Sequence, residues 1–193
     1  MRPSLTAPLL AATAAILVLP LAACNRGPSV SATNASISEV REKVAAATGG
    51  NGEVMIEPGR WEGTYAMHEM DMPGLPPAAK EQMKKQMGME RSFVNCVTEE
   101  DVKKQKMLYT GDDKSCTYDH FTLGGGKIDA TMACNREGAG KMEMTMTGTY
   151  SPAAYHMDMA AKAEGGGPMG GMTMKMSVDA KRVGACKGTK DEL

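Results

Sequence analysis

Large aliphatic and aromatic residues are scarce in this chain. Its 193 residues include only two Phe, one Trp and five Tyr, and Leu and Ile are few after the first 21 positions. Such residues normally fill a protein interior, so their shortage excludes an ordinary core of Leu, Ile and Phe. Methionine is abundant instead, with 19 residues. Two interpretations follow: methionine replaces the usual core residues, or it binds a soft metal ion.

An excess of charge of either sign is also missing. The 22 Lys and Arg residues nearly balance the 23 Asp and Glu residues, which leaves a net charge of −1. Nucleic-acid-binding proteins usually carry a basic surface, so we expect no nucleic-acid partner. The length predicts one folded domain with room for a real core.

Motifs of catalysis are absent as well. The chain has no G-x-S-x-G motif, no phosphate-binding P-loop and no dinucleotide-binding fingerprint. Its histidines, His68, His120 and His156, are too dispersed to form a zinc-binding pattern. Strand alternation places His68 and His156 on polar faces, whereas His120 shares a face with Cys116 and is expected in the core. We predict no enzymatic activity and no cofactor.

The N-terminus resembles the signal sequence of a bacterial lipoprotein. Arg2 precedes an apolar segment over residues 7–23 that is short for a membrane span and ends in small residues. The sequence Leu21-Ala22-Ala23-Cys24 is similar to a lipobox. In that family the cysteine thiol is diacylated, the signal is then cleaved before the cysteine, and the new amine is acylated. The resemblance implies a signal peptide over residues 1–23 and a lipid anchor on Cys24, whose two or three acyl chains give stable attachment.

This anchor predicts a place in the bacterial cell envelope, facing the periplasm, with the membrane as partner. Residue 25 is Asn rather than Asp, which favours the outer membrane over the inner one. Two other motifs conflict with a bacterial source. The chain ends in Lys190-Asp191-Glu192-Leu193, a match to the endoplasmic-reticulum retrieval signal, and Asn34-Ala35-Ser36 matches a glycosylation acceptor. Both act only in a eukaryotic secretory pathway, and we interpret both as coincidental.

Four cysteines remain once the lipobox cysteine is set aside: Cys96, Cys116, Cys134 and Cys186. An even number in an oxidising compartment predicts two disulfides, and no close C-x-x-C spacing supports zinc. Glycines at 124–126 predict a hairpin tip, which places Cys116 opposite Cys134 when the tip is centred on the middle glycine. This geometry favours Cys116–Cys134 and Cys96–Cys186 among three possible pairings. A one-residue bulge would change the register, so the alternatives stay open.

The segment before the main domain predicts a tether and a helix. Residues 25–35 are rich in Asn, Ser, Gly, Pro and Ala, as flexible linkers are. Ser36 and Glu39 have the spacing of a capping box, and the apolar face of the following helix ends at Gly49. The expected divisions after the signal peptide are residues 24–54 (acylated cysteine, tether and short helix), 55–187 (a single disulfide-bearing β domain) and 188–193 (a short tail).

The sequence of the main domain predicts a mostly β structure with one or two short helices. Residues 78–88 have a helical pattern, and Thr98 is a suitable cap for a second short helix. Apolar and polar residues alternate in the other segments, as in a sheet with one face in water. The expected strands cover residues 61–70, 91–97, 115–122, 127–134, 140–150, 154–160 and 172–183. The predicted fold is a curved antiparallel sheet or a partial up-and-down barrel, with α+β as the alternative class.

Methionine occupies the apolar positions of these strands. Met142, Met144 and Met146 alternate with polar residues, and the same alternation places others on equivalent faces. These others are Met132, Met157, Met159, Met172, Met174 and Met176. Methionine is apolar and flexible enough to fill irregular spaces. About half of the methionines fall on the apolar faces of the predicted strands. The pattern therefore favours core packing for these residues.

Two methionine-rich segments, 67–72 and 169–176, are not fully explained by packing. Thioether sulfur favours Cu(I) and Ag(I), so a soft-metal site at these segments is the alternative prediction. Its candidate ligands are Met67, His68, Met70, Met72, Met169 and Met172.

A set of short motifs follows in a fixed order along the domain. The motifs are Pro58-Gly59-x-Trp61-Glu62, Met72-Pro73, Cys96-Val97-Thr98-x-Glu100, Cys116-x-Tyr118, Cys134, Gly148-Thr149-Tyr150-Ser151 and Arg182-x-Gly184-x-Cys186. Together they resemble the bacterial envelope family called domain of unknown function 3617, over about residues 55–187. The resemblance implies a secreted domain with disulfides and transfers no activity, substrate or binding residue.

The predicted function is that of a non-catalytic envelope lipoprotein, with a binding role for an apolar ligand or a structural role. A curved sheet lined by flexible methionines suits an apolar ligand such as a lipid or a peptide. The alternative is a periplasmic protein that binds Cu(I) or Ag(I) through its methionine clusters.

Overall fold

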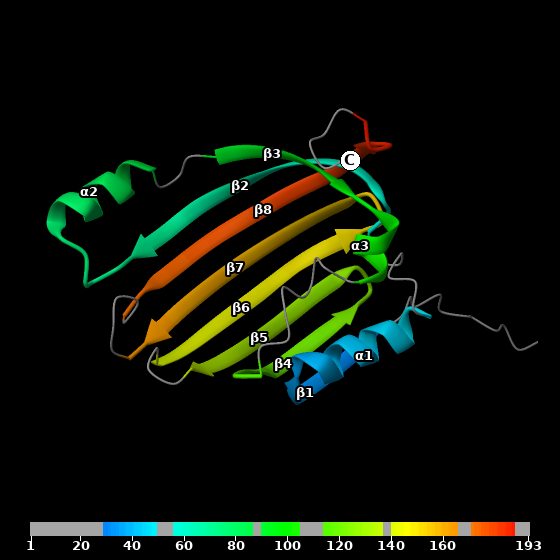
Figure 1. Cartoon of the computed structure of the whole chain (residues 1–193), viewed down its shortest axis with the longest axis horizontal. Coiled ribbons are helices and arrows are strands. Elements are labelled where there is room, and N and C mark those ends of the chain that lie inside the picture. Colours follow the sequence, from blue (N-terminus) through cyan, green and yellow to red (C-terminus); the bar gives the residue numbers. More distant parts are fainter. Residues whose placement is uncertain are drawn as a thin grey trace, which may run out of the picture.

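The computed structural model describes residues 29–49, 56–86, 90–104, 114–136, 140–165 and 171–187. These residues form one open antiparallel sheet of eight strands with three short helices (Figure 1). The strands are β1 (Val30–Ser36), β2 (Gly59–Asp71), β3 (Glu90–Val97), β4 (Cys116–Gly124), β5 (Lys127–Arg136), β6 (Gly140–Ser151), β7 (Ala154–Glu164) and β8 (Thr173–Gly184). The helices are α1 (Ile37–Ala47), α2 (Pro77–Gln86) and α3 (Glu99–Lys103).

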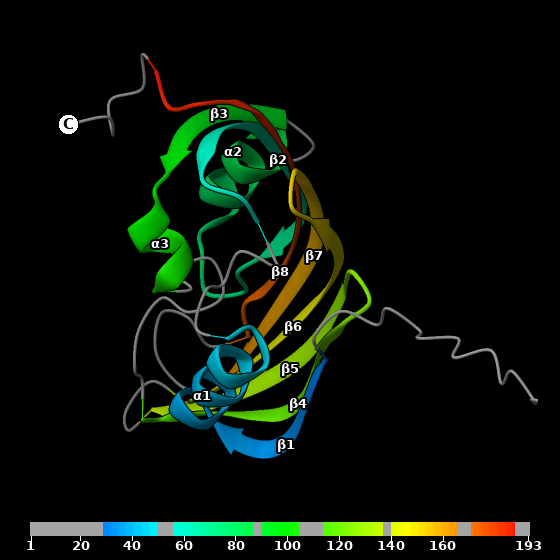
Figure 2. The ribbon, with the colours of Figure 1, turned by 90° about the vertical axis from the view of Figure 1, so that its right-hand side faces the viewer.

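The strands are ordered β1-β4-β5-β6-β7-β8-β2-β3 in the sheet. Strands β4 to β7 each pair with the next strand along the chain, and the last strand, β8, also pairs with β2. Strands β1 and β3 form the two edges, so the sheet is not closed. Figure 2 shows the sheet as a curved layer, with α1 and α3 on its inner, concave side. The predicted mainly β fold with a curved antiparallel sheet is thereby confirmed.

Each strand predicted from alternation is present. In β7, Met157 and Ala161 are buried on the inner face, while Asp158 and Lys162 are exposed on the outer face. The β4–β5 turn lies at the predicted glycine run, and Gly125 and Gly126 both have positive φ angles of 59° and 73°. A two-residue turn of this kind suits residues without a Cβ atom.

The prediction of a flexible tether over residues 25–35 is wrong for its second half. Val30–Ser36 forms edge strand β1, which pairs antiparallel with β4. Val30, Ala32 and Ala35 are buried against the sheet. Small residues were sufficient here because the strand lies under α1, so its side chains need little bulk to fill the space. The folded unit therefore begins well before the predicted boundary at residue 55.

Helix α1 begins at the predicted capping box. The Ser36 backbone N–H donates to Glu39 Oε2 at 2.7 Å, and the Glu39 N–H donates to Ser36 Oγ at 3.2 Å. Val40 and Val44 of this helix are completely buried, and α1 contacts β1 and β4. No helix in the described ranges is both long and apolar enough to cross a membrane.

The core has two parts joined by Tyr155. The larger part lies between α1 and the inner face of β1, β4 and β5, and includes the fully buried Phe121. The smaller part surrounds Trp61, with Ile56 and Val102 of α3. The Tyr155 ring packs against both parts, and its centroid lies 5.5 Å from that of Trp61. The aromatic residues are few, but they occupy the centres of the two clusters.

The expectation that His120 lies in the core is wrong. A bulge at residue 119 shifts the β4–β5 register between Tyr118 and His120. The bulge turns Phe121 and Leu123 inward and leaves the His120 side chain 47% exposed, 3.9 Å from Asp129. Simple alternation cannot reveal an inserted residue of this kind, because each bulge reverses the phase of the side chains that follow.

Candidate functional site

Methionines form two rows across the inner face of the sheet. In the first row, direct cross-strand pairs join Met146 of β6 to Met159 of β7, then to Met176 of β8 and Met67 of β2. The second row runs parallel to it through Met132, Met144, Ala161, Met174 and Met70. We call this surface the methionine face, defined by Met67, Met70, Met132, Met144, Met146, Met159, Met174 and Met176.

The methionine face differs from the sealed core beside it. Each of its eight methionines is half-buried, whereas Phe121 and Val44 in the core under α1 are fully buried. Among the described helices, α1 contacts the sheet at β1 and β4, and α2 contacts it at β2. The methionines therefore line the inner face as a partly accessible apolar surface that extends from β5 to β2.

The pairing of β2 with β8 brings together the two methionine-rich segments singled out by sequence. Met67 pairs with Met176, and Met70 pairs with Met174. Simple alternation would put Met67 and Met70 on opposite faces, but a register shift between Met67 and Glu69 puts both on the same face. The two segments are far apart in sequence, and nothing in either segment alone indicates that they are neighbours.

The remaining candidate metal ligands are placed differently. Met72 and Met172 follow the last β2–β8 pair, Asp71 with Thr173, and Met172 is buried. His68 bonds through Nε2 to Ser177 Oγ at 2.7 Å on the outer face, so it is separated from the methionines. Met169 lies outside the described residues. The structure thus brings four of the six candidates, Met67, Met70, Met72 and Met172, to one strand pair, and it places His68 on the opposite face.

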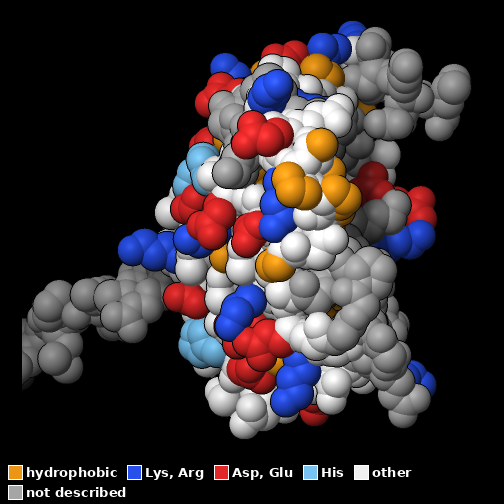
Figure 3. All heavy atoms as spheres, turned by 90° about the vertical axis from the view of Figure 1, so that its left-hand side faces the viewer, with side chains coloured by type: hydrophobic (Ala, Val, Ile, Leu, Met, Phe, Trp, Pro, Cys, Tyr) orange, Lys and Arg blue, Asp and Glu red, His pale blue; other side chains and the backbone are white. Residues whose placement is uncertain are grey.

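The outer face of the sheet is polar. His156 bonds to Asp179 at 2.8 Å and to Asp158 at 3.1 Å. The bond to Asp179 is the main cause that raises the pKa of His156, and Asp158 contributes in the same direction. In Figure 3 the histidine side chains lie at the margin that corresponds to this face, among acidic and basic groups. The described residues contain no group of three or more His, Cys, Asp or Glu arranged to bind a metal ion.

The two disulfides tie opposite parts of the sheet. Cys116 is bonded to its cross-strand partner Cys134, and Cys96 is bonded to Cys186. These are the pairings that the predicted hairpin favoured, and two departures from that simple hairpin cancel each other. The turn is centred between Gly125 and Gly126 rather than on Gly125, and the bulge at residue 119 restores the register.

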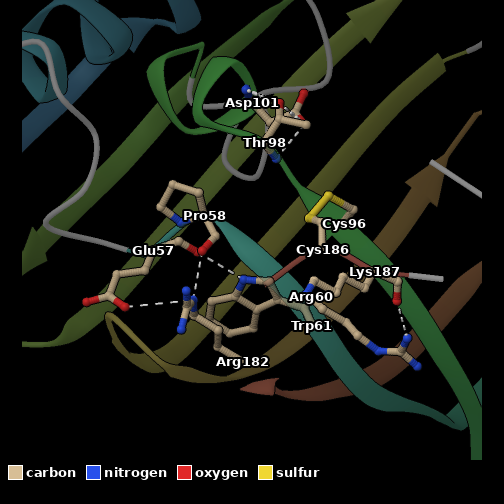
Figure 4. Close-up of a disulfide and its surroundings, with 10 residues drawn as sticks. All are labelled: Glu57, Pro58, Arg60, Trp61, Cys96, Thr98, Asp101, Arg182, Cys186 and Lys187. Carbon is tan, nitrogen blue, oxygen red and sulfur yellow. Dashed lines mark hydrogen bonds and ion pairs between the residues drawn. A yellow bond between two sulfur atoms is a disulfide. The ribbon is translucent and has the colours of Figure 1, made fainter. Parts of the chain in front are cut away.

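The Cys96–Cys186 bond lies in a compact cluster at one end of β2 and β8 (Figure 4). Arg182 Nε donates to the Pro58 carbonyl at 2.7 Å, and Trp61 Nε1 donates to the Glu57 carbonyl at 3.0 Å. Gly59 has a φ of 148°, and a Cβ there would lie 2.4 Å from the Gly184 carbonyl oxygen. Only glycine suits that close approach.

This cluster gives a physical reason for three of the seven ordered sequence motifs. The first, third and last motifs, which contain Trp61, Cys96 and Cys186, are distant in sequence. Their residues converge on the Cys96–Cys186 bond. Thr98, from the third motif, caps α3: its Oγ1 accepts a hydrogen bond from the Asp101 N–H at 3.1 Å. These three motifs thus specify how β2, β3 and β8 are joined, and none of their residues belongs to the methionine face.

Comparison with curated proteins finds no match, and comparison with solved structures finds none either. A family model described as "Protein of unknown function (DUF3617)" matches residues 56–186, which is more than half of the chain. This range contains the cluster around the Cys96–Cys186 bond, the Cys116–Cys134 bond and the whole methionine face. It does not contain β1 and α1. The chain therefore belongs to the family of proteins of unknown function DUF3617.

Proposed function

We propose that this protein is a non-catalytic module of the bacterial cell envelope that binds an apolar ligand on the methionine face. The observation that carries the proposal is the pair of half-buried methionine rows across β5, β6, β7, β8 and β2. Flexible thioether side chains adapt to apolar ligands of varied shape. A concave apolar surface with few polar groups is the usual form of a binding site for such ligands.

A lipid or acyl chain is the ligand that fits this surface best. The rows contain only thioether and methyl groups, which offer dispersion contacts and no strong hydrogen bonds. The lipobox sequence supports the same source, since a lipid anchor on Cys24 would hold the domain at a membrane, with the outer membrane favoured. The membrane is thus both the proposed partner and the proposed supply of ligand.

Mass spectrometry of lipid extracted from the full chain, purified from its own envelope, tests this proposal. We expect a bound lipid in the wild type and about tenfold less in Met144→Gln/Met159→Gln, because each change removes apolar contact worth about 0.8 kcal/mol. The matched control, Thr147→Gln/Lys162→Gln, changes exposed outer-face residues on the same two strands and should retain the lipid. An extract of the wild-type protein without lipid would contradict the proposal.

The second candidate function is binding of Cu(I) or Ag(I), and the β2–β8 pairing favours it. This pairing places Met70 beside Met174, and Met72 and Met172 follow the last pair, Asp71 with Thr173. Several thioether groups at one end of a strand pair suit a soft monovalent ion.

Competition with a chromophoric Cu(I) chelator under anaerobic conditions tests the metal hypothesis. The wild-type chain at micromolar concentration should remove Cu(I) from the chelator, and Met70→Leu/Met174→Leu should not. Met132→Leu/Met144→Leu, a directly paired couple elsewhere on the methionine face, is the control and should behave as the wild type. No competition by the wild type rules this function out.

A further inference from the structure

A groove with a volume of about 660 Å³ crosses the neighbouring strands β3, β2, β8, β7 and β6. We call it the outer groove. Two rows of directly paired residues form its walls, and the backbone of the row between them forms its floor. The first wall is Ser92, Thr64, Asp179, His156 and Thr149, and the second wall is Val94, Glu62, Lys181, Ala154 and Ser151.

Side-chain alternation places the outer groove on the face of the sheet opposite the methionine rows. The next inward-facing residues on three of its strands, Tyr65, Met157 and Val178, do not line the groove. Figure 2 shows α1 and α3 on the concave side, so neither helix covers it. Seven of the ten wall residues are exposed and three are half-buried. The walls are therefore accessible to a ligand from solvent.

Several polar groups of the walls have no partner within the described part of the chain. The hydroxyl groups of Ser92, Thr64 and Thr149 make no hydrogen bond there, and the ammonium group of Lys181 makes no ion pair. Asp179 bonds His156 through Oδ1 alone, and its side chain is 63% exposed. The groove thus offers hydroxyl groups, an ammonium donor and a carboxylate oxygen to a ligand.

The charges of the walls balance. His156 Nδ1 bonds Asp179 at 2.8 Å and Nε2 bonds Asp158 at 3.1 Å. Carboxylates only accept, so both imidazole nitrogens donate and the ring is a cation in this arrangement. Among the wall residues, His156 and Lys181 therefore offset Asp179 and Glu62. A strongly charged ligand of either sign would meet a like charge, and a neutral polar ligand would not.

We propose that the outer groove binds an extended, uncharged oligosaccharide. Sugar hydroxyl groups both donate and accept hydrogen bonds, so they complement every free group of the walls. Val94, which is 47% exposed, and Ala154 offer apolar contact to the C–H groups of the sugar rings. Five strands spaced about 4.8 Å apart span roughly 19 Å, which requires several sugar units in a straight chain. This site is independent of the ligand proposed for the methionine face.

The imidazole of His156 provides a direct measurement by NMR. The chain has three histidines, and the other two, His68 and His120, lie on the same face outside the groove. The full chain with both disulfides intact is titrated with hexa-N-acetylchitohexaose, an uncharged and straight β-1,4-linked chain. We expect saturable shifts of the His156 resonances while His68 and His120 stay unchanged. No saturable shift, or equal shifts of all three histidines, overturns the proposal.

Three further oligosaccharides test shape and charge. Maltohexaose has the same number of sugars in a coiled chain and should bind more weakly. Deacetylated chitohexaose carries ammonium groups and hexagalacturonate carries carboxylates, so each should also bind more weakly than the neutral chain. Binding of maltohexaose as tight as that of the straight chain removes the requirement for an extended ligand. Equal or tighter binding of either charged chain contradicts the match to a neutral ligand.

Two wall hydroxyls can be removed without a change of side-chain shape. Thr64→Val/Thr149→Val should lower the affinity for hexa-N-acetylchitohexaose about tenfold, because two hydrogen bonds are lost. Thr131→Val/Thr145→Val changes a directly paired couple on the outer face outside the groove and should bind as the wild type does. Equal affinities of the two variants contradict the assignment.

A steric variant tests the position of the site separately. Ala154→Phe places a ring in the groove and should prevent binding. Ala160→Phe, on the outer face of the same strand but outside the groove, should leave the affinity unchanged. Wild-type affinity in Ala154→Phe, or a loss of binding in Ala160→Phe, shows that the oligosaccharide does not occupy the outer groove.

Discussion

Arg182 Nε donates a hydrogen bond of 2.7 Å to the carbonyl oxygen of Pro58, which lies 124 residues earlier in the chain. The same nitrogen is 3.7 Å from Glu57 Oε2. These contacts join the last strand, β8, to the residues that lead into β2, beside the Cys96–Cys186 bond. A single guanidinium group thus fastens the two ends of the family domain to each other.

Arg182→Gln should destabilise the protein by about 1–2 kcal/mol, the range for a hydrogen bond to a charged group that is partly exposed. The ion pair with Glu57 adds little, because the Glu57 side chain is 51% exposed. Urea unfolding with intact disulfides measures the effect. Arg91→Gln on edge strand β3 is the control and should change stability by less than about 0.5 kcal/mol. Equal effects of the two variants would show that the Pro58 contact contributes nothing.

The two disulfides should differ in their contributions to stability. Cys96 and Cys186 are separated by 90 residues, and Cys116 and Cys134 by 18. The chain-entropy model gives roughly 4.6 kcal/mol for the longer loop and roughly 3.2 kcal/mol for the shorter one. Cys96→Ser/Cys186→Ser should therefore lower the unfolding midpoint more than Cys116→Ser/Cys134→Ser. The reverse order, measured by denaturant unfolding, would show that native contacts near the bonds outweigh loop length.

Stability should depend on the protonation of His156. Its pKa is raised, chiefly by the hydrogen bond to Asp179. A raised folded-state pKa stabilises the protein fully below the unfolded value of about 6.5, and this contribution is lost as pH rises through the folded-state pKa. Asp179→Asn should therefore reduce the stability advantage of about pH 5.5 over about pH 8.

Titration of the imidazole by NMR checks this directly. The pKa of His156 should fall toward its ordinary value in Asp179→Asn, with Asp158 still holding part of the increase. Asp129→Asn, near His120 on the same outer face, is the matched control and should leave the His156 titration unchanged. An unaltered His156 pKa in Asp179→Asn would disprove the role of that hydrogen bond.

Gly63→Ala should be strongly destabilising, although Gly63 lies in the middle of a strand. A Cβ there would lie 2.4 Å from the Asp179 carbonyl oxygen and 2.5 Å from Cζ of Phe93. Overpacking of this kind costs about 1–3 kcal/mol. Gly74→Ala, where no atom lies within 4 Å, should be nearly neutral in the same thermal unfolding experiment. Similar melting temperatures for both variants would mean that the Phe93 ring and the Asp179 backbone both shift at little cost.

Alternation of apolar and polar residues was enough to predict the strands and the face on which most methionines lie. That success has a physical basis, because one face of this sheet is wet along nearly its full length. The positions of the β-bulges could not be predicted from this alternation. The bulge at residue 119 moved His120 outward, and the register shift near His68 brought Met70 onto the face of Met67. Neither position carries a local signal such as glycine or proline.

Strand order was also not predictable from local pattern. The adjacency of β2 and β8 depends on contacts between residues more than 100 positions apart, such as Met67 with Met176. The composition of residues 30–35 indicated a linker. These residues form a strand instead, because their small side chains are buried under α1. The small core cluster around Trp61 was not predictable either, because its buried residues come from segments that are distant in sequence.

The early start of β1 changes how a lipid anchor would act. Val30 pairs with Leu123 next to the β4–β5 turn, so the chain enters the sheet at the end where that turn lies. From Cys24 to Val30 a fully extended chain reaches at most roughly 22 Å. An acylated Cys24 would therefore keep this end of the sheet close to the bilayer surface and limit the orientations of the domain, instead of letting it move freely on a stalk.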